Sequence, residues 1–159
     1  MKLSHDVNLD QFDRRLLHAL QANGRLSNAE LAERVFLSPS QCQRRVKKLE
    51  ELGIIQRYVA LLDSDRIGLG VTAVINVTLE KHGESQARAF KEAIERHPQI
   101  LECWSITGEA DYLLRVVAPD LKAFSDFLMR DLLNLPLATS VRSNILLEQV
   151  KFTTALPLP

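Results

Sequence analysis

The first sixty residues repeat apolar positions with the period of an α-helix in three places. The predicted helices span residues 10–22, 27–35 and 38–52. Their N-termini are marked by Asp10 as a cap, by the capping box of Ser27 and Glu30, and by Ser38 with Pro39 at the first helical position. Left-handed helix ends are predicted at Asn23-Gly24 and Gly53. Two short helices, a tight turn and a third helix are typical of a helix-turn-helix.

The third helix is amphipathic, and its outer face is polar and basic. Cys42, Val46 and Leu49 follow the spacing of one helix face, which we expect to be buried, with Cys42 as a small core residue. Side chains near its N-terminus have the donors and acceptors that read base edges, and the lysines suit phosphates. The residues predicted to contact DNA are Ser38, Ser40, Gln41, Gln43, Arg44, Arg45, Lys47, Lys48 and Arg57. An ordinary solvated helix face is the alternative interpretation.

Residues 54–63 alternate apolar and polar positions and are rich in β-branched side chains. The pattern predicts a short hairpin or two strands, which directly after a recognition helix would form a wing. Gly68 and Gly70 mark a linker over residues 64–70. The expected organisation is therefore a winged helix-turn-helix domain in residues 1–63, the linker, and a second domain in residues 71–159.

The second domain alternates strand and helix patterns in the order βαββαβ. The predicted elements are strands at 71–80, 100–107, 111–117 and 139–150 and helices at 84–96 and 119–135. A turn is predicted at Lys81-His82-Gly83, and Leu135-Pro136 is predicted to end the second helix. Residues 71–79 place Ala73, Ile75 and Val77 on one face. The order predicts a four-stranded antiparallel sheet with two helices on one face, a ferredoxin-like α+β fold. The uncovered sheet face predicts a homo-oligomer.

Composition narrows the classes of protein but does not identify one. Of 159 residues, 46% are apolar and 25% charged, ordinary values for a globular protein. Lys+Arg and Asp+Glu both number 20, yet the part up to Tyr58 holds ten against seven, so the predicted DNA-binding half is basic. No apolar run reaches membrane-spanning length, and we expect no membrane partner. Two separated cysteines, Cys42 and Cys103, and a start without a signal peptide predict a cytoplasmic protein.

One segment of the second domain carries candidate binding chemistry. Residues 107–112 combine a glycine, two carboxylates and an aromatic ring at a strand turn. Backbone amides there can hold a carboxylate and a side-chain carboxylate can hold an ammonium group, which suits an amino acid. A plain β-turn is the alternative. We identify no catalytic set, no cofactor motif and no metal-ligand spacing, and predict no enzyme.

Several motifs together resemble the Lrp/AsnC family, the leucine-responsive or feast/famine transcriptional regulators. They are Leu9-Asp10, Asn23-Gly24-Arg25, Ser38-Pro39, the run from Lys48 to Ile55, the run from Gly108 to Leu114, and the ending from Lys151 to Leu158. The resemblance implies operator DNA binding by the N-terminal domain, and assembly and amino-acid binding between subunits by the C-terminal domain. Carried over by position, the effector residues would be Thr107, Gly108, Glu109, Asp111 and Tyr112, with Ser140 and Ser143 on the last strand.

Three other functions remain open at this point. One is an architectural DNA-binding protein without an effector, and another is an amino-acid sensor that pairs with a protein. The third is an enzyme on a ferredoxin-like domain, since a fold does not determine a function.

Overall fold

The computed structural model describes residues 8–80, 83–135 and 138–159, which belong to two compact units. One unit comprises the chain up to Leu61 together with Lys151–Pro159, and the other runs from Leu62 to Val150. The C-terminal segment is tied to the first unit by the side-chain amide of Gln21, which exchanges two hydrogen bonds with the backbone of Leu156. The turn predicted at Lys81-His82 and the helix end predicted at Pro136 lie outside the described residues.

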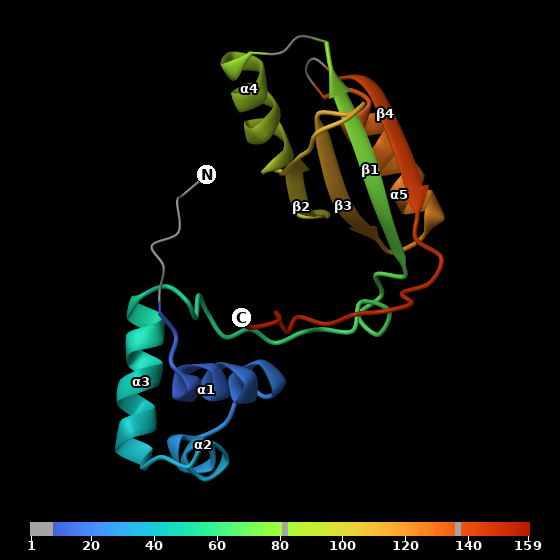
Figure 1. Ribbon diagram of the computed structural model, residues 1–159. Helices are drawn as coiled ribbons and strands as arrows, with labels where there is room; N and C mark the ends of the chain where they lie inside the picture. Colours follow the sequence, from blue (N-terminus) through green and yellow to red (C-terminus); the bar gives the residue numbers. More distant parts are fainter. Residues whose placement is uncertain (1–7, 81–82, 136–137) are drawn as a thin grey trace. The chain divides into compact units, whose positions relative to one another are not determined.

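The first unit contains three helices (Figure 1), and each begins directly after a predicted cap. They are α1 (Gln11–Ala22), α2 (Asn28–Val35) and α3 (Pro39–Glu51), preceded by Asp10, Ser27 and Ser38. Each cap side chain accepts a hydrogen bond from the N–H of the third helical residue, whose side chain accepts one from the cap N–H. Gly53, with φ +71°, follows the end of α3 as predicted. The core between the helices includes Leu16, Leu31, Val35 and Cys42.

The predicted left-handed end of α1 is wrong. Asn23 is extended, with φ −150° and ψ 101°, and Gly24 is absent from the residues with positive φ in the described chain. A Cβ atom on Gly24 would lie 3.2 Å from Cδ1 of the Tyr58 ring. The glycine at this position is therefore explained by the close approach of an aromatic ring from further along the chain.

The predicted hairpin in residues 54–63 is also wrong. The segment contains no strand, and the side chains of Val59, Leu61 and Leu62 are exposed. A strand forms only when its backbone groups pair with another strand, and within the described residues this segment has no such partner. The residues do alternate between apolar and polar, but alternation alone does not provide a neighbouring strand for backbone hydrogen bonds.

The second unit has the predicted order of elements. They are β1 (Val71–Leu79), α4 (Glu84–Ile94), β2 (Ile100–Ser105), β3 (Tyr112–Ala118), α5 (Leu121–Phe127), the π-helix η1 (Leu128–Leu132) and β4 (Ala138–Ile145). All strand pairs are antiparallel, in the order β2-β3-β1-β4. This is the ferredoxin-like arrangement predicted from the sequence.

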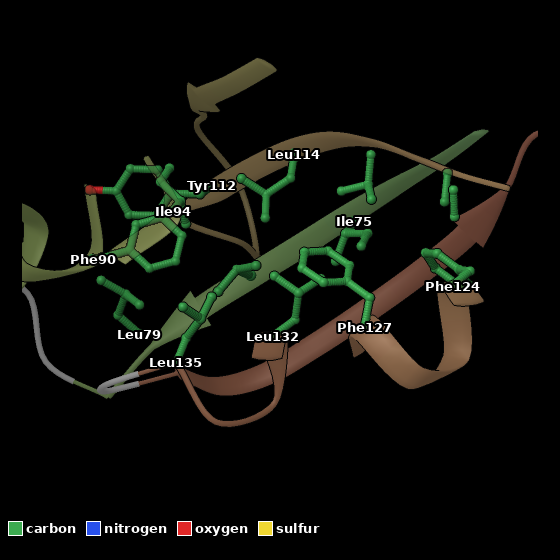
Figure 2. Close-up of a cluster of buried hydrophobic side chains, with 14 residues drawn as sticks. Ile75, Leu79, Phe90, Ile94, Tyr112, Leu114, Phe124, Phe127, Leu132 and Leu135 are labelled. Carbon is green, nitrogen blue, oxygen red and sulfur yellow. The ribbon is translucent and has the colours of Figure 1, made fainter. Parts of the chain in front are cut away.

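The core lies between the helices and one face of the sheet. Ile75 on β1 and Leu114 on β3 are register partners and point to the same side, where Phe90 of α4 and Phe127 of α5 pack (Figure 2). The alternate residues of β1, including Asn76 and Thr78, lie on the face that these helices do not cover.

The last predicted helix departs from a regular α-helix after Phe127. Its five-residue π turn changes which side chains face the core, because the repeat there exceeds the α-helical period. Helical periodicity would place Leu121, Phe124, Leu128 and Leu132 on one side of this helix; Phe124 and Leu132 are buried, but Leu121 is exposed and Leu128 only partly buried. Phe127 and Leu135 complete the core in their place.

Candidate functional site

The outer face of α3 is exposed over most of its length. Cys42 and Leu49 are buried, as predicted, and Cys42 has no exposed area. The exposed residues among those predicted to contact DNA are Ser38, Ser40, Gln41, Gln43, Arg44, Lys47, Lys48 and Arg57. Lys47 lies 3.7 Å from Glu51 one turn along, an exposed pair that contributes little and leaves the ammonium group accessible.

The N-terminal end of α3 is organised by Ser38 and Gln41. The Gln41 amide oxygen accepts hydrogen bonds from the N–H and the hydroxyl of Ser38, at 3.0 and 3.1 Å. The Ser38 hydroxyl also lies 3.1 Å from the Ser40 hydroxyl. The cap thereby orients the Gln41 side chain, so that its NH2 group is the end with donors for a base edge.

Arg45 differs from its neighbours because it is held by carboxylates of the same chain. Its Nη1 lies 2.7 Å from both Asp10 Oδ2 and Asp13 Oδ1, and the guanidinium lies 5.5 Å from the centroid of the Phe12 ring. The carboxylates of Asp13 and Asp10 raise the pKa of Arg45. Backbone N–H donation from Asp13 is the main cause that lowers the pKa of Asp10, with a further contribution from Arg45. Arg45 therefore connects α3 to the start of α1.

The uncovered face of the sheet contains a hollow of about 430 Å³. Its lining comes from β1, β4 and the loop between β2 and β3, and consists of Asn76, Thr78, Ile106, Glu109, Ala110, Ser140 and Arg142. Glu109 and Ser140 were among the predicted effector residues, and the structure brings them to one hollow. Arg142 Nη1 lies 3.6 Å from Glu109 Oε2, and both side chains are largely exposed.

The loop beside this hollow is shaped by Gly108 and Asp111. Gly108 has φ +117°, a conformation that side-chain-bearing residues rarely adopt. The Asp111 carboxylate accepts a hydrogen bond of 2.8 Å from the N–H of Leu79, and the Asp111 N–H donates to the carbonyl of Val77. Asp111 therefore fastens the loop to the end of β1, while Thr78 donates a hydroxyl hydrogen bond to the carbonyl of Glu109.

Five predicted effector residues are outside the lining of the hollow: Gly108 and Asp111, which shape the loop beside it, and Tyr112, Ser143 and Thr107. Tyr112 is buried in the core on the opposite face, with its ring 4.5 Å from that of Phe90 (Figure 2), and burial raises the pKa of its hydroxyl. Ser143 is the register partner of Ile75 and so lies on the helix side of the sheet, opposite in orientation to Ser140. Thr107 is exposed and is outside the lining.

Sequence reasoning missed Asn76, Thr78 and Arg142 as members of this hollow. The sequence pattern could have indicated Asn76 and Thr78, because they are the polar positions of a strand that alternates apolar and polar residues. Their relation to β4 required the register, in which Thr78 faces Ser140 and Asn76 faces Arg142.

The two cysteines have no partner for a disulfide, and burial raises the pKa of both thiols. Within the described residues, no group of three or more His, Cys, Asp or Glu side chains could hold a metal ion. No helix in that part of the chain is long and apolar enough to span a membrane.

Both halves of the chain match known domain families. Residues 9–56 match a winged helix-turn-helix DNA-binding domain, and residues 72–156 match the Lrp/AsnC ligand-binding domain. The DNA-binding transcriptional activator DecR of Escherichia coli K12 is 39% identical over 150 residues, covering 94% of this chain and 99% of that protein. The leucine-responsive regulatory protein of Rhizobium meliloti is 39% identical over 145 residues, covering 91% and 93%.

Solved structures that resemble this chain are also those of transcriptional regulators. A transcriptional regulator from Neisseria meningitidis, crystallised as a complex with L-Met, matches with a TM-score of 0.90 and 41% identity over 94% of this chain and 97% of its own. An AsnC family regulator from Agrobacterium tumefaciens matches with a TM-score of 0.87 and 38% identity, covering 93% and 96%.

Proposed function

The chain belongs to the Lrp/AsnC family of transcriptional regulators, and from that premise we propose how its own residues bind operator DNA and an amino-acid effector. The observation that carries the proposal is the exposed polar face of α3. The opposite face of this helix is buried, and hydrogen bonds of the N-terminal cap order its first turn. A helix of this kind enters the major groove with its N-terminal residues nearest the bases. Arg44 and Gln41 read base edges, and Lys48 contacts phosphate.

The matched pair Arg44→Ala and Lys48→Ala tests these roles. Arg44→Ala weakens binding to the operator by about 1–3 kcal/mol and relaxes specificity, because a bidentate base contact is lost. Lys48→Ala weakens binding to all duplexes. It also reduces the slope of the logarithm of the binding constant against the logarithm of the salt concentration by about one, because one fewer counterion is released. Fluorescence anisotropy on the DNA upstream of the gene and on random DNA measures both. Equal affinity of the unaltered protein for the two duplexes would favour an architectural protein instead.

We assign the effector site to the hollow on the uncovered sheet face. Glu109 and Arg142 present opposite charges across it, and their exposed ion pair is weak enough to be replaced by a ligand. The Glu109 carboxylate binds the α-ammonium group of an amino acid, and the Arg142 guanidinium binds its α-carboxylate. The neutral groups of Asn76, Thr78 and Ser140 supply further hydrogen bonds. L-Met is the first ligand to test, because a similar regulator was crystallised with it.

Calorimetry with L-Met, followed by the other amino acids, tests this assignment. Arg142→Gln and Glu109→Gln each lower the affinity of the bound amino acid by about tenfold or more, the value of one charged hydrogen bond. Arg115→Gln is the matched control, since Arg115 pairs with Glu102 on the same sheet face but outside the hollow. Equal effects of all three substitutions would argue against the site.

The effector site is completed by a second subunit. The hollow is open on a sheet face that the helices do not cover, and Trp104 on that face is 46% exposed. A second copy that covers this face buries the indole and encloses the ligand. The regulator accordingly acts as a homodimer or larger oligomer, and as a DNA-binding regulator it acts in the cytoplasm. Light scattering with and without the effector measures the assembly.

A further inference from the structure

Phe36 forms the left-handed end of α2, a position that glycine suits best, and the packing of the first unit does not explain why an exposed phenylalanine occupies it. It follows α2 in the left-handed conformation, with φ 57° and ψ 48°, and it is the one residue other than glycine with positive φ in the described chain. Its side chain is also 82% exposed. A single exposed apolar residue is common, but a phenylalanine held in a conformation that favours glycine carries a backbone cost as well.

The neighbours of Phe36 leave its ring little freedom to turn inward. Val35 is buried and Leu37 packs against the same core, so the chain is anchored on both sides. The N–H groups of Phe36 and Leu37 both donate to the carbonyl of Ala32. The left-handed turn between two anchored residues therefore projects the ring into solvent.

This ring projects beside the end of α3 that is expected to enter the major groove. Phe36 precedes Pro39, the first residue of α3, by three residues, so their Cα atoms lie within about 11 Å. Ser38, Ser40 and Gln41 lie in the same stretch. The apolar groups that DNA presents in the major groove are the C5 methyl groups of thymine, and phenylalanine is one of the residues that contact them.

We propose that Phe36 is a specificity-determining DNA contact that packs against a thymine methyl group beside the recognition helix. The inference rests on the proposed DNA-binding function. It adds an apolar contact from the turn before α3 to the polar contacts of the helix itself. The conformational cost at Phe36 is then offset when the ring leaves water at the DNA interface.

The test compares Phe36→Gly with the unaltered protein on operator DNA and on the same duplex with thymines replaced one at a time by deoxyuridine. Removing the ring lowers operator affinity by about tenfold, the effect expected when part of an aromatic side chain no longer leaves water. The unaltered protein loses affinity at one particular thymine-to-uracil change for each bound subunit, and the Phe36→Gly protein shows no further loss there. Phe36→Tyr keeps the ring and stays close to the unaltered protein.

The thermal unfolding midpoint separates this contact from a role in folding. Glycine suits the left-handed conformation, so Phe36→Gly keeps or raises the midpoint while DNA affinity falls. A lowered midpoint together with weaker binding would assign Phe36 to folding and overturn the proposal. Unchanged operator affinity, or a loss that is the same at every uracil position, would overturn it too. So would a change in oligomer size that accounts for the weaker binding. If the unaltered protein does not distinguish operator from random DNA, the proposed function itself fails.

Discussion

Replacing Arg45 by glutamine separates a contact within the protein from a contact with DNA. Arg45 is one of the basic residues that the sequence places with the DNA-binding set, yet its guanidinium bonds Asp10 and Asp13. The substitution removes the charge and both hydrogen bonds. The expected result is a less stable first unit with DNA contacts otherwise intact.

The size of the effect follows from exposure. The bond to Asp13 joins side chains that are 26% and 14% exposed, so it is worth about 1.5–2 kcal/mol as a partly buried, charge-assisted hydrogen bond. The pair with Asp10 is more exposed and adds about 0.5 kcal/mol after screening by solvent. Arg45→Gln therefore lowers the free energy of unfolding by about 2 kcal/mol, which in a unit of this size moves its midpoint by roughly 10 °C.

Two probes follow the two units separately in the full chain. The single tryptophan, Trp104, lies in the second unit, so its fluorescence reports unfolding there. Hydrogen exchange of the α1–α3 amides reports the first unit. Arg45→Gln accelerates exchange in α1 and α3 and leaves the Trp104 transition unchanged. Arg44→Gln, an exposed neighbour on the same helix, is the matched control and changes neither.

The pKa of Asp10 predicts how the stabilisation by the Arg45 contact changes with pH. The pKa of Asp10 is lowered in the folded state below its ordinary 3.8, so the stabilisation is complete above that pH and is lost as pH falls through the folded pKa. Backbone N–H donation from Asp13 is the main cause of this lowering and remains in Arg45→Gln, so only the part that Arg45 contributes is lost and the difference between the two proteins narrows modestly below pH 3.8. If Arg45→Gln reduces DNA affinity and its salt dependence without any loss of stability, Arg45 is a phosphate contact and this reasoning is refuted.

Three further predictions concern single residues of the core and the loop. Asp111→Ala removes the acceptor for the Leu79 N–H and lowers the free energy of unfolding of the second unit by about 1–3 kcal/mol in urea titrations followed by Trp104 fluorescence; an unchanged midpoint would show that water replaces the carboxylate. Gly108→Ala places a side chain at φ +117° and costs about 1–3 kcal/mol by the same assay, together with weaker effector binding, whereas Gly83→Ala, at an extended position, costs much less. Cys103 reacts with a thiol reagent before Cys42 in the native protein, because Cys42 is fully buried; mass spectrometry of timed samples measures the order, and equal rates would contradict the burial of Cys42.

Local signals determined most of the helices and strands. The caps at Asp10, Ser27 and Ser38 were readable because each needs only its own side chain and a partner three residues away. The alternation of β1 was readable because one of its faces is buried. The order of strands and helices then led to the ferredoxin-like sheet, since few topologies suit that order. The exposed face of α3 followed from helical periodicity.

Other features depend on residues distant in sequence. The basic character of Arg45 predicts a DNA contact, and the structure adds that Asp10 and Asp13, more than thirty residues earlier, bind its guanidinium. The sequence by itself determined which residues are polar, capped or periodic, because these are properties of short segments. Only the tertiary structure decided that Ser140, Asn76 and Glu109 share one hollow while Ser143 and Tyr112 turn away, because strand register and sheet face arise from pairing between segments.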